Sequence, residues 1–389
     1  MIHESDNHNE FLRRARQHIS IVGGGAMSCP ETRTSMFCDV EAARDWLNYD
    51  LRVTLQVADE ELQHFERCFV NQHNQIVWTC DYNDMFRHLR LIFNDEKITS
   101  ACFPQLTDVN ELNDEDKCPL YHELGLPFFL SDEKIELGER GQAQFFHPDR
   151  LLTKFGYMLF CSMSNHAFSM LNNSKTNIFI VTIDQLLSNI YLAEVFSTFY
   201  NQSLQQRQGM QVIFHGNDNC RNILFVVNNQ RTEVLKHIGL RSIFNCLQCY
   251  RCNAVCPVEQ VAGKKSYHNI FTGPQACVLL PYMETEEGEK YTSEACVMCG
   301  RCEEVCPLHL SLRDMIVEAR KDLLQRNITD RGQRQLIKRA GNMLQSRSNM
   351  NGCNLWKKIQ FYSYVNPELK EEYSMPSFAD KTFDKLQKK

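Results

Sequence analysis

A duplicated cysteine pattern constrains this chain more than any other feature of its sequence. Each copy reads C-x2-C-x2-C-x3-C-P, so three cysteines crowd together and a fourth directly precedes a proline. The two copies contain eight of the 18 cysteines: Cys246, Cys249, Cys252 and Cys256 before Pro257, and Cys296, Cys299, Cys302 and Cys306 before Pro307. This spacing is typical of the ligands of two [4Fe–4S] clusters.

In two-cluster proteins the cysteine before proline ligates the other cluster, and this exchange divides the eight cysteines into two sets. Cluster 1 is expected to take Cys246, Cys249, Cys252 and Cys306. Cluster 2 is expected to take Cys296, Cys299, Cys302 and Cys256. The two motifs are therefore predicted to form one unit, in which each cluster carries one electron at a time.

The alternative is a pair of zinc sites in a zinc-stabilised interaction protein. Zinc sites usually combine separated cysteine pairs, whereas here three cysteines crowd together twice, which favours iron–sulfur clusters. The two motifs also form an internal repeat with an offset of fifty residues, in which Arg251 corresponds to Arg301 and Val255 to Val305. Duplication of a cluster-binding unit favours electron relay.

The composition predicts a cytoplasmic protein. Its 389 residues suggest two or three domains, and a hydrophobic content of 43% is enough for a core. We find no run of about 18 apolar residues and no apolar stretch after Arg13-Arg14, so neither a transmembrane segment nor an export signal is expected. Peripheral membrane association stays open. The net charge of −6 gives no reason to expect a nucleic-acid partner.

Seven apolar runs of strand length precede the cysteine motifs, and helical patterns lie between several of them. The runs are Gln75–Thr79, Ile98–Phe103, Pro127–Leu130, Tyr157–Cys161, Asn177–Thr182, Gln211–Phe214 and Asn222–Val227. Broad apolar faces predict helices over Asn83–Asn94 and Gln185–Leu204. This alternation predicts an α/β domain with a largely parallel sheet flanked by helices.

The hydrophobic period changes after Val227. A helix is predicted over Thr232–Ile243 and another from Ser311, and both Cys-Pro prolines suit the first turn of a helix. These features predict an α-helical ferredoxin domain with two clusters. The expected organisation is an N-terminal helical region at 1–60, an α/β domain at 61–230, the ferredoxin domain at 231–330 and a helical or extended tail at 331–389.

Several stretches resemble the lactate utilization protein B family, the iron–sulfur protein of the L-lactate utilization system. They are Leu224–Leu235, the two cysteine motifs with Gly263–Pro281 between them, and the tail from Trp356 through Met375 to Phe383. The chain is similar to a short, divergent member. The resemblance implies an α/β domain like those of sugar isomerases and CoA transferases. It also implies a three-protein system oxidising L-lactate to pyruvate, with a cysteine-rich A-type and a C-type lactate utilization protein as partners.

The α/β domain departs from that family at three motifs. Cys161–Asn165 replaces an acidic, glycine-containing turn, Asn228–Arg231 replaces Asp-Asn-Gly-Arg, and Phe103–Asp108 replaces a lysine–serine-rich motif. We therefore assign no catalytic residue. Gly23–Gly25 lacks the third glycine and the uninterrupted helix of a dinucleotide site, so no nucleotide site is predicted there.

Electron counting indicates the role of such a chain. Oxidation of a 2-hydroxy acid to a 2-oxo acid releases two electrons and two protons, whereas each cluster accepts one electron and no substrate atom. We therefore expect a non-catalytic electron-transfer subunit that passes electrons to an unidentified acceptor. Two alternatives stay open: a subunit of a heterodisulfide-reductase-like or anaerobic glycerol-phosphate-dehydrogenase-like complex, and a redox-sensing, ligand-binding protein.

Overall fold

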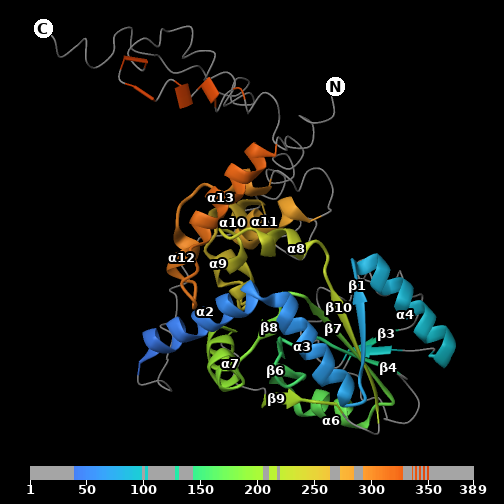
Figure 1. Cartoon of the computed structure of the whole chain (residues 1–389). Helices are drawn as coiled ribbons and strands as arrows, with labels where there is room; N and C mark the ends of the chain where they lie inside the picture. Colours follow the sequence, from blue (N-terminus) through green and yellow to red (C-terminus); the bar gives the residue numbers. More distant parts are fainter. Residues whose placement is uncertain are drawn as a thin grey trace, which may run out of the picture. The chain divides into compact units, whose positions relative to one another are not determined.

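A computed structural model gives the three-dimensional structure of the chain (Figure 1). It describes residues 39–98, 101–103, 128–130, 143–204, 210–216, 220–262, 272–283 and 292–326, with isolated residues between 335 and 349. The described residues from 39 to 319 belong to one compact unit, in which an α/β body is followed by a helical domain.

A parallel sheet of six strands forms the centre of the α/β body. Its strand order is β1 (Gln75–Thr79), β10 (Arg221–Val227), β7 (Thr176–Thr182), β4 (Ala143–Phe146), β2 (Ala101–Phe103) and β3 (Phe128–Leu130). Every recorded pair of neighbouring strands is parallel. Parallel sheets are usually covered on both faces, which explains why β7 and β10 are nearly continuous apolar runs. The predicted α/β domain with a parallel sheet is confirmed.

Different layers cover the two faces of this sheet. Phe225 of β10 belongs to the apolar cluster of α4 (Tyr82–Glu96). Its neighbour Leu224 belongs to the cluster of α3 (Ala58–Asn71) and α6 (Asn165–Asn173), because successive strand residues point to opposite faces. The sheet is therefore buried between α4 on one side and a layer that includes α3 and α6 on the other.

A second, mixed sheet packs on the α3 side and was not predicted. Its order is β8 (Leu186–Leu187), β5 (Arg150–Leu152), β6 (Tyr157–Met163) and β9 (Met210–Phe214). β6 pairs antiparallel with β5 and β9, whereas β5 and β8 are parallel. The helix predicted from Gln185 begins instead at Tyr191, as α7 (Tyr191–Leu204), because residues 186 and 187 pair with β5.

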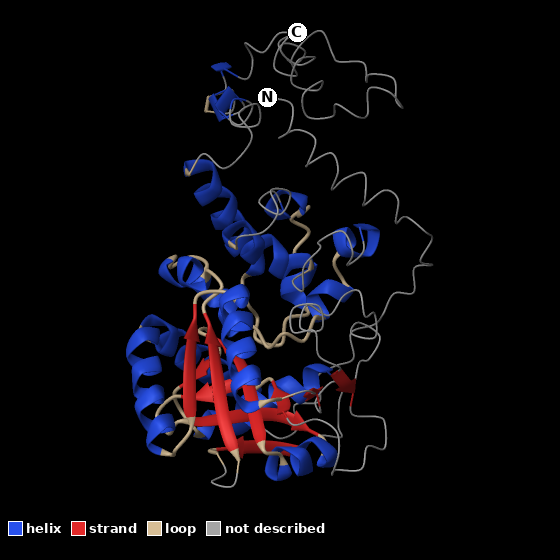
Figure 2. Ribbon diagram, turned by 90° about the vertical axis from the view of Figure 1, so that its right-hand side faces the viewer, coloured by secondary structure: helices blue, strands red, loops and turns tan. Residues whose placement is uncertain are grey.

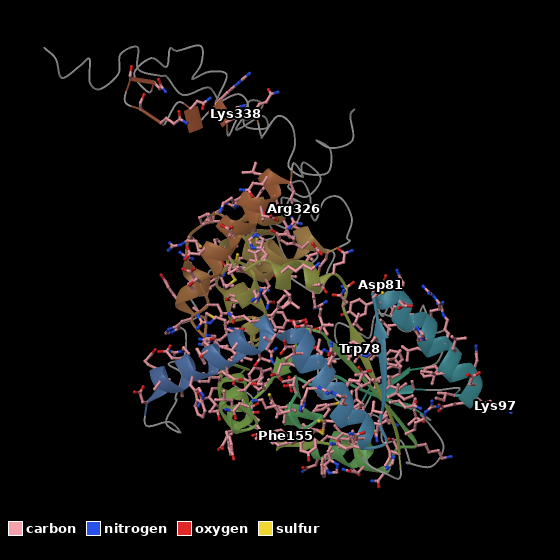
Figure 3. All side chains as sticks on the ribbon, viewed as in Figure 1. Trp78, Asp81, Lys97, Phe155, Arg326 and Lys338 are labelled. Carbon is pink, nitrogen blue, oxygen red and sulfur yellow. The ribbon has the colours of Figure 1, made fainter. Side chains whose placement is uncertain are left out.

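Aspartate side chains cap two helices of the α/β body. Asp39 accepts a backbone hydrogen bond at the start of α2 (Val40–Gln56), and Asp81 does the same for α4. Lys97, with φ of 55°, ends α4, and Figure 3 shows Asp81 and Lys97 at its two ends. Within the described residues, no helix combines the length and the apolar character needed to cross a membrane.

Beyond residue 227 the described elements are helices (Figure 2). They are α8 (Arg231–Lys236), η2 (Arg241–Asn245), α9 (Arg251–Ala254), α10 (Pro257–Ala262), α11 (Gly273–Leu279), η4 (Leu280–Tyr282), α12 (Arg301–Glu304) and α13 (Leu312–Gln325), where η marks a 3₁₀ helix. The helix predicted over Thr232–Ile243 is interrupted after Lys236. Pro257 begins α10 as predicted, but Pro307 lies in a turn, so the prediction is wrong there.

The α/β body and the helical domain share one hydrophobic core. Leu51 of α2 and Phe196 of α7 belong to the same apolar cluster as Ile243, Leu280 and Ile316 of the helical domain. Burial of this apolar surface stabilises the association of the two parts. The cysteine motifs are therefore packed onto the α/β body.

Candidate iron–sulfur site

The two cysteine motifs fold into the same kind of loop. Gln248 and Met298, which correspond in the repeat, have φ of 55° and 58°. Tyr250 and Gly300 also correspond and have φ of 53° and 81°. These left-handed residues turn the chain twice within each motif, after which α9 or α12 begins. The internal repeat of the sequence is thus a repeat of backbone structure.

Each loop directs a backbone N–H group at its first cysteine. Gln248 donates to Cys246 Sγ over 3.3 Å, and Met298 donates to Cys296 Sγ over 3.4 Å. A hydrogen bond to sulfur favours its negatively charged form. The loops are therefore suited to hold the first cysteine of each motif as a thiolate ligand.

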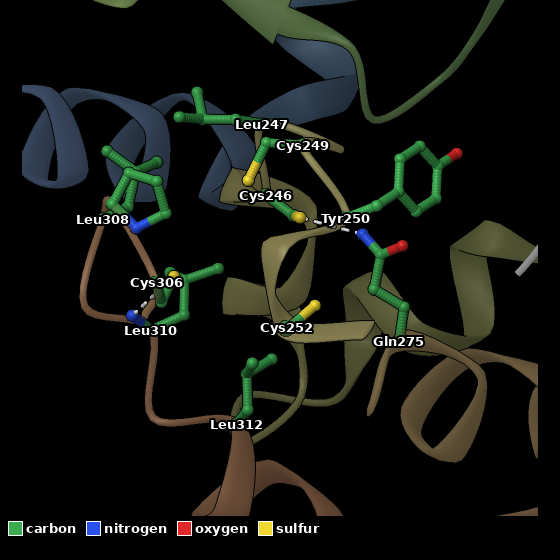
Figure 4. Close-up of a pocket in the computed structure, with 11 residues that line it drawn as sticks. Cys246, Leu247, Cys249, Tyr250, Cys252, Gln275, Cys306, Leu308, Leu310 and Leu312 are labelled. Atoms are coloured by element: carbon green, nitrogen blue, oxygen red, sulfur yellow. Dashed lines mark hydrogen bonds between the residues drawn. The ribbon is translucent and has the colours of Figure 1, made fainter. Parts of the chain in front are cut away.

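One hollow, hollow 1, gathers the first three cysteines of the first motif with the last cysteine of the second (Figure 4). It is lined by Cys246, Cys249, Cys252 and Cys306, with Leu247, Tyr250, Gln275, Pro307, Leu308, Leu310 and Leu312 around them. Its volume is about 390 Å³, including the part open to solvent. Gln275 Nε2 donates to Cys246 Sγ over 2.8 Å, and Leu310 N–H donates to Cys306 Sγ over 3.4 Å.

A second hollow, hollow 2, has the reciprocal composition. It is lined by Cys256, Cys296, Cys299 and Cys302, with Pro257, Val258, Pro274, Val297, Met298, Gly300, Arg313 and Ile316 around them. Its volume is about 350 Å³, again with the part open to solvent. Two hollows of similar size thus contain four cysteines each, and Cys306 and Cys256 each lie with the other motif.

Burial and mutual proximity disfavour free thiolates in both hollows. Burial raises the pKa of the Cys246 thiol to about 12, with nearby Cys249 and Cys306 adding to the rise. Burial likewise raises the pKa of Cys302 to about 12, and Cys296 adds to it. Thiols that face one another under these conditions lose their protons readily only to a positive metal centre. The donor set therefore fits an iron–sulfur cluster in each hollow.

The spacing of the side chains bears on the kind of centre. Within the described ranges, no three His, Cys, Asp or Glu side chains are grouped so as to hold a single metal ion. A [4Fe–4S] cluster binds its thiolates through four separate irons, so its ligands stand further apart than those around one zinc ion.

The two hollows differ in their exposure. Cys299 at hollow 2 is exposed, and Val297, which also lines hollow 2, is 63% exposed. At hollow 1, Arg44 Nε of α2 donates to Pro307 O over 2.7 Å, and Asn48 Nδ2 donates to Leu308 O over 2.9 Å. Hollow 2 therefore lies at the surface, whereas α2 helps to cover hollow 1.

The motifs that depart from the resembled family have local structural roles. Ser164 caps α6 by accepting a hydrogen bond from Ala167 N, and Cys161 is buried in β6. Asn228 Oδ1 accepts from Thr232 N at the start of α8. Gly23–Gly25, most of Phe103–Asp108 and the tail from Trp356 lie outside the described residues.

Sequence reasoning missed two polar residues beside hollow 1. Gln275 falls within Gly263–Pro281, so the family resemblance is the signal that pointed to its segment. Arg150, on β5 of the α/β body, donates to Cys246 O over 3.0 Å. No motif marks Arg150, because its role depends on a contact between residues 96 positions apart.

The fold and the cysteines place the site in the iron–sulfur class, and a family model agrees. Residues 242–310, which include all eight cysteines of the motifs, match the model described as a 4Fe-4S dicluster domain. This match supports [4Fe–4S] clusters as the cofactor type.

Named relatives show which iron–sulfur proteins this chain is similar to. "Lactate utilization protein B" of an Exiguobacterium species is 32% identical over 102 residues, which cover 26% of this chain and 22% of that protein. "Lactate utilization protein B 2" of Bacillus mycoides is 35% identical over 102 residues, covering 26% of this chain and 21% of that protein. The chain thus matches about a fifth of the length of these relatives. Over this segment the predicted resemblance is confirmed.

Among solved structures, a DUF162 family protein from Deinococcus radiodurans shows a weak likeness. The TM-score is 0.33 at 10% sequence identity, and the alignment covers 44% of this chain and 98% of that chain. A likeness at this level carries no conclusion about function.

Proposed function

We propose that this chain is the iron–sulfur electron-transfer subunit of a complex that oxidises L-lactate to pyruvate. The observation that carries the proposal is the pair of hollows, each lined by four cysteines, in a chain that is similar over 102 residues to lactate utilization protein B. In this proposal, the α/β body belongs to the sugar-isomerase and CoA-transferase-like class, and the ferredoxin domain begins near residue 231.

The cysteines of hollow 1 would hold cluster 1 and those of hollow 2 would hold cluster 2, giving two [4Fe–4S] clusters per chain. When bound, each cluster takes up and releases one electron at a time. The chain supplies the thiolates and N–H groups directed at their sulfur atoms. Leucine side chains around hollow 1 limit the access of water to its cysteines.

Partners carry out the oxidation itself. Conversion of L-lactate to pyruvate releases two electrons and two protons, and the sequence carries no complete flavin or nicotinamide fingerprint. The A-type and C-type lactate utilization proteins are therefore the proposed partners, the compartment is the cytoplasm, and the final acceptor is a carrier still to be identified.

Reconstitution tests this function. The chain, prepared anaerobically, should contain about eight irons, because two clusters carry four each. Lactate should bleach the cluster absorbance only when the A-type and C-type proteins are present. Cys299→Ala should interrupt the delivery of electrons to an added acceptor. Cys277→Ala is the matched control, because Cys277 is a buried cysteine outside both hollows.

Three results would each refute part of the proposal. Zinc with negligible iron would refute the iron–sulfur assignment. Lactate oxidation by the isolated chain at the rate of the complex would refute the role of a non-catalytic subunit. A fully loaded complex that lactate does not reduce would refute lactate as the substrate.

A further inference from the structure

A buried arginine of the α/β body reaches the first cysteine loop. Arg150 is 3% exposed and lies on β5. Its Nη2 donates to Cys246 O over 3.0 Å and to Phe244 O over 3.2 Å, and its Nη1 donates to Asp184 O over 3.2 Å. These hydrogen bonds hold a positive charge of the α/β body beside Cys246 of the helical domain.

The charge of Arg150 has no carboxylate bonded to it among the described residues. Its three hydrogen-bond acceptors are main-chain carbonyl groups, and its guanidinium lies 4.8 Å from the centroid of the Phe196 ring. The Asp184 carboxylate instead pairs with Arg231 at 2.7 Å. The Asp184 and Asp149 carboxylates lie close enough to favour the charged form of Arg150, but neither is hydrogen-bonded to it. Because a buried cation without a bonded carboxylate is costly, its retention here suggests a further anionic counterpart.

Cluster 1 would be that counterpart. A [4Fe–4S] cluster with four thiolates is anionic, and uptake of an electron makes it more so. A fixed cation within the low-dielectric interior stabilises the reduced state more than the oxidised state, and salt screens it little. The Gln275 N–H donated to Cys246 Sγ acts in the same direction. Burial of the cluster acts oppositely, because a poor solvent disfavours added negative charge.

Hollow 2 has a different electrostatic setting. Acidic residues act on its cysteines: in addition to burial, the Glu259 carboxylate helps to raise the pKa of Cys256, and the Glu303 carboxylate helps to raise that of Cys302. Arg313 also lines hollow 2, but it lies 3.9 Å from the Glu303 carboxylate, and its side chain is 51% exposed. The positive charge at hollow 2 is therefore partly paired and open to solvent screening.

We infer that Arg150 holds the reduction potential of cluster 1 above that of cluster 2, so that electrons pass from the exposed cluster 2 to cluster 1 beside the α/β body. This inference rests on the proposed function, since it needs two clusters. Each step moves one electron without a proton: cluster 2 is oxidised and cluster 1 is reduced. The α/β body would then set the direction of electron flow as well as support the cluster domain.

Potentiometry of the full-length, cluster-loaded chain tests the inference, with dithionite as reductant and electron paramagnetic resonance as readout. Cys299→Ala removes cluster 2 and Cys249→Ala removes cluster 1 under either ligand assignment, so the remaining signal in each identifies one midpoint. Cluster 1 should have the higher midpoint in the wild-type chain. Arg150→Gln should lower that midpoint by at least a tenfold change in the reduction equilibrium, about 59 mV for one electron.

Control variants separate charge from packing. Arg150→Lys should retain most of the wild-type midpoint, because it keeps the cation. Arg87→Gln removes the same formal charge from an exposed side chain of α4 and should leave both midpoints unchanged.

The outcomes distinguish this inference from the proposed function. Wild-type iron well below two clusters refutes the proposed function before any potential is measured. With both clusters present, a wild-type midpoint of cluster 2 above that of cluster 1 overturns the inference, even if Arg150→Gln fails to load. An unchanged cluster 1 midpoint in loaded Arg150→Gln, or an equal shift of both clusters, also overturns it.

Discussion

Iron counting in double variants tests whether the two motifs exchange their fourth ligands. Cys256 lies in hollow 2 with Cys299, fifty residues from its counterpart Cys306 in hollow 1. Burial raises the pKa of Cys256, and Cys296 of the other motif adds to the rise. These contacts predict that Cys256 and Cys299 serve the same cluster.

The predicted losses follow from the composition of each hollow. Cys256→Ala with Cys299→Ala should remove one cluster and leave about four of about eight irons per chain. Cys249→Ala with Cys256→Ala should remove both clusters and leave about none. If each motif held its own cluster, the two double variants would give the reverse pattern. The comparison therefore needs no assignment of spectra.

The assay is iron and sulfide per chain after anaerobic reconstitution, with the visible absorbance as a second measure. Cys277→Ala should retain about eight irons, because Cys277 donates to Thr292 O and lines neither hollow. The exchange is refuted if the variant of Cys256 and Cys299 loses all its iron while the variant of Cys249 and Cys256 keeps half.

Three further predictions concern stability, measured by urea denaturation. Asp184→Asn should lower the free energy of unfolding by about 3–5 kcal/mol, because it breaks a buried ion pair with Arg231. Glu233→Gln, which removes an exposed ion pair with Lys236, should lower it by less than about 1 kcal/mol. Equal losses in the two variants would contradict this reasoning. Gly156→Ala should cost more than about 1 kcal/mol, because φ is +67° and the added Cβ would lie 2.6 Å from Phe69 N. Gly341→Ala, where a Cβ would meet no atom within 4 Å, should be nearly neutral, and a comparable loss there would show that the backbone argument is wrong. Burial lowers the pKa of His147, so its contribution to stability is complete above the pKa of the unfolded chain, about 6.5, and is lost as the pH falls through it. In the wild-type chain, the free energy of unfolding should therefore fall between about pH 7.5 and 5.5, and His147→Asn should make this fall smaller. If the dependence of the free energy of unfolding on pH is unchanged in the variant, the fall belongs to another group.

The local hydrophobic period was sufficient to predict the long strands and helices of the α/β body. Asn222–Val227 and Asn83–Asn94 each contain enough residues for a strand or helix pattern, and they fold as β10 and α4. The second sheet could not be predicted in this way. Arg150–Leu152 and Leu186–Leu187 are too short to show a period, and their pairing depends on tertiary contacts. Because Leu186 and Leu187 pair with β5, α7 begins at Tyr191 and not at Gln185 as predicted.

The candidate cysteine ligands could be recognised in the sequence because a cluster requires residues of one type at fixed intervals, and such intervals are visible within a few residues of sequence. The charge that surrounds a cluster has no such requirement, since a cation acts on it from any element that the fold brings near. Arg150 illustrates this difference: it belongs to a three-residue strand, and only the packing of the α/β body against the helical domain places it at Cys246 O. A motif can therefore indicate a cluster site, whereas the buried charges around that site are revealed only by the tertiary structure.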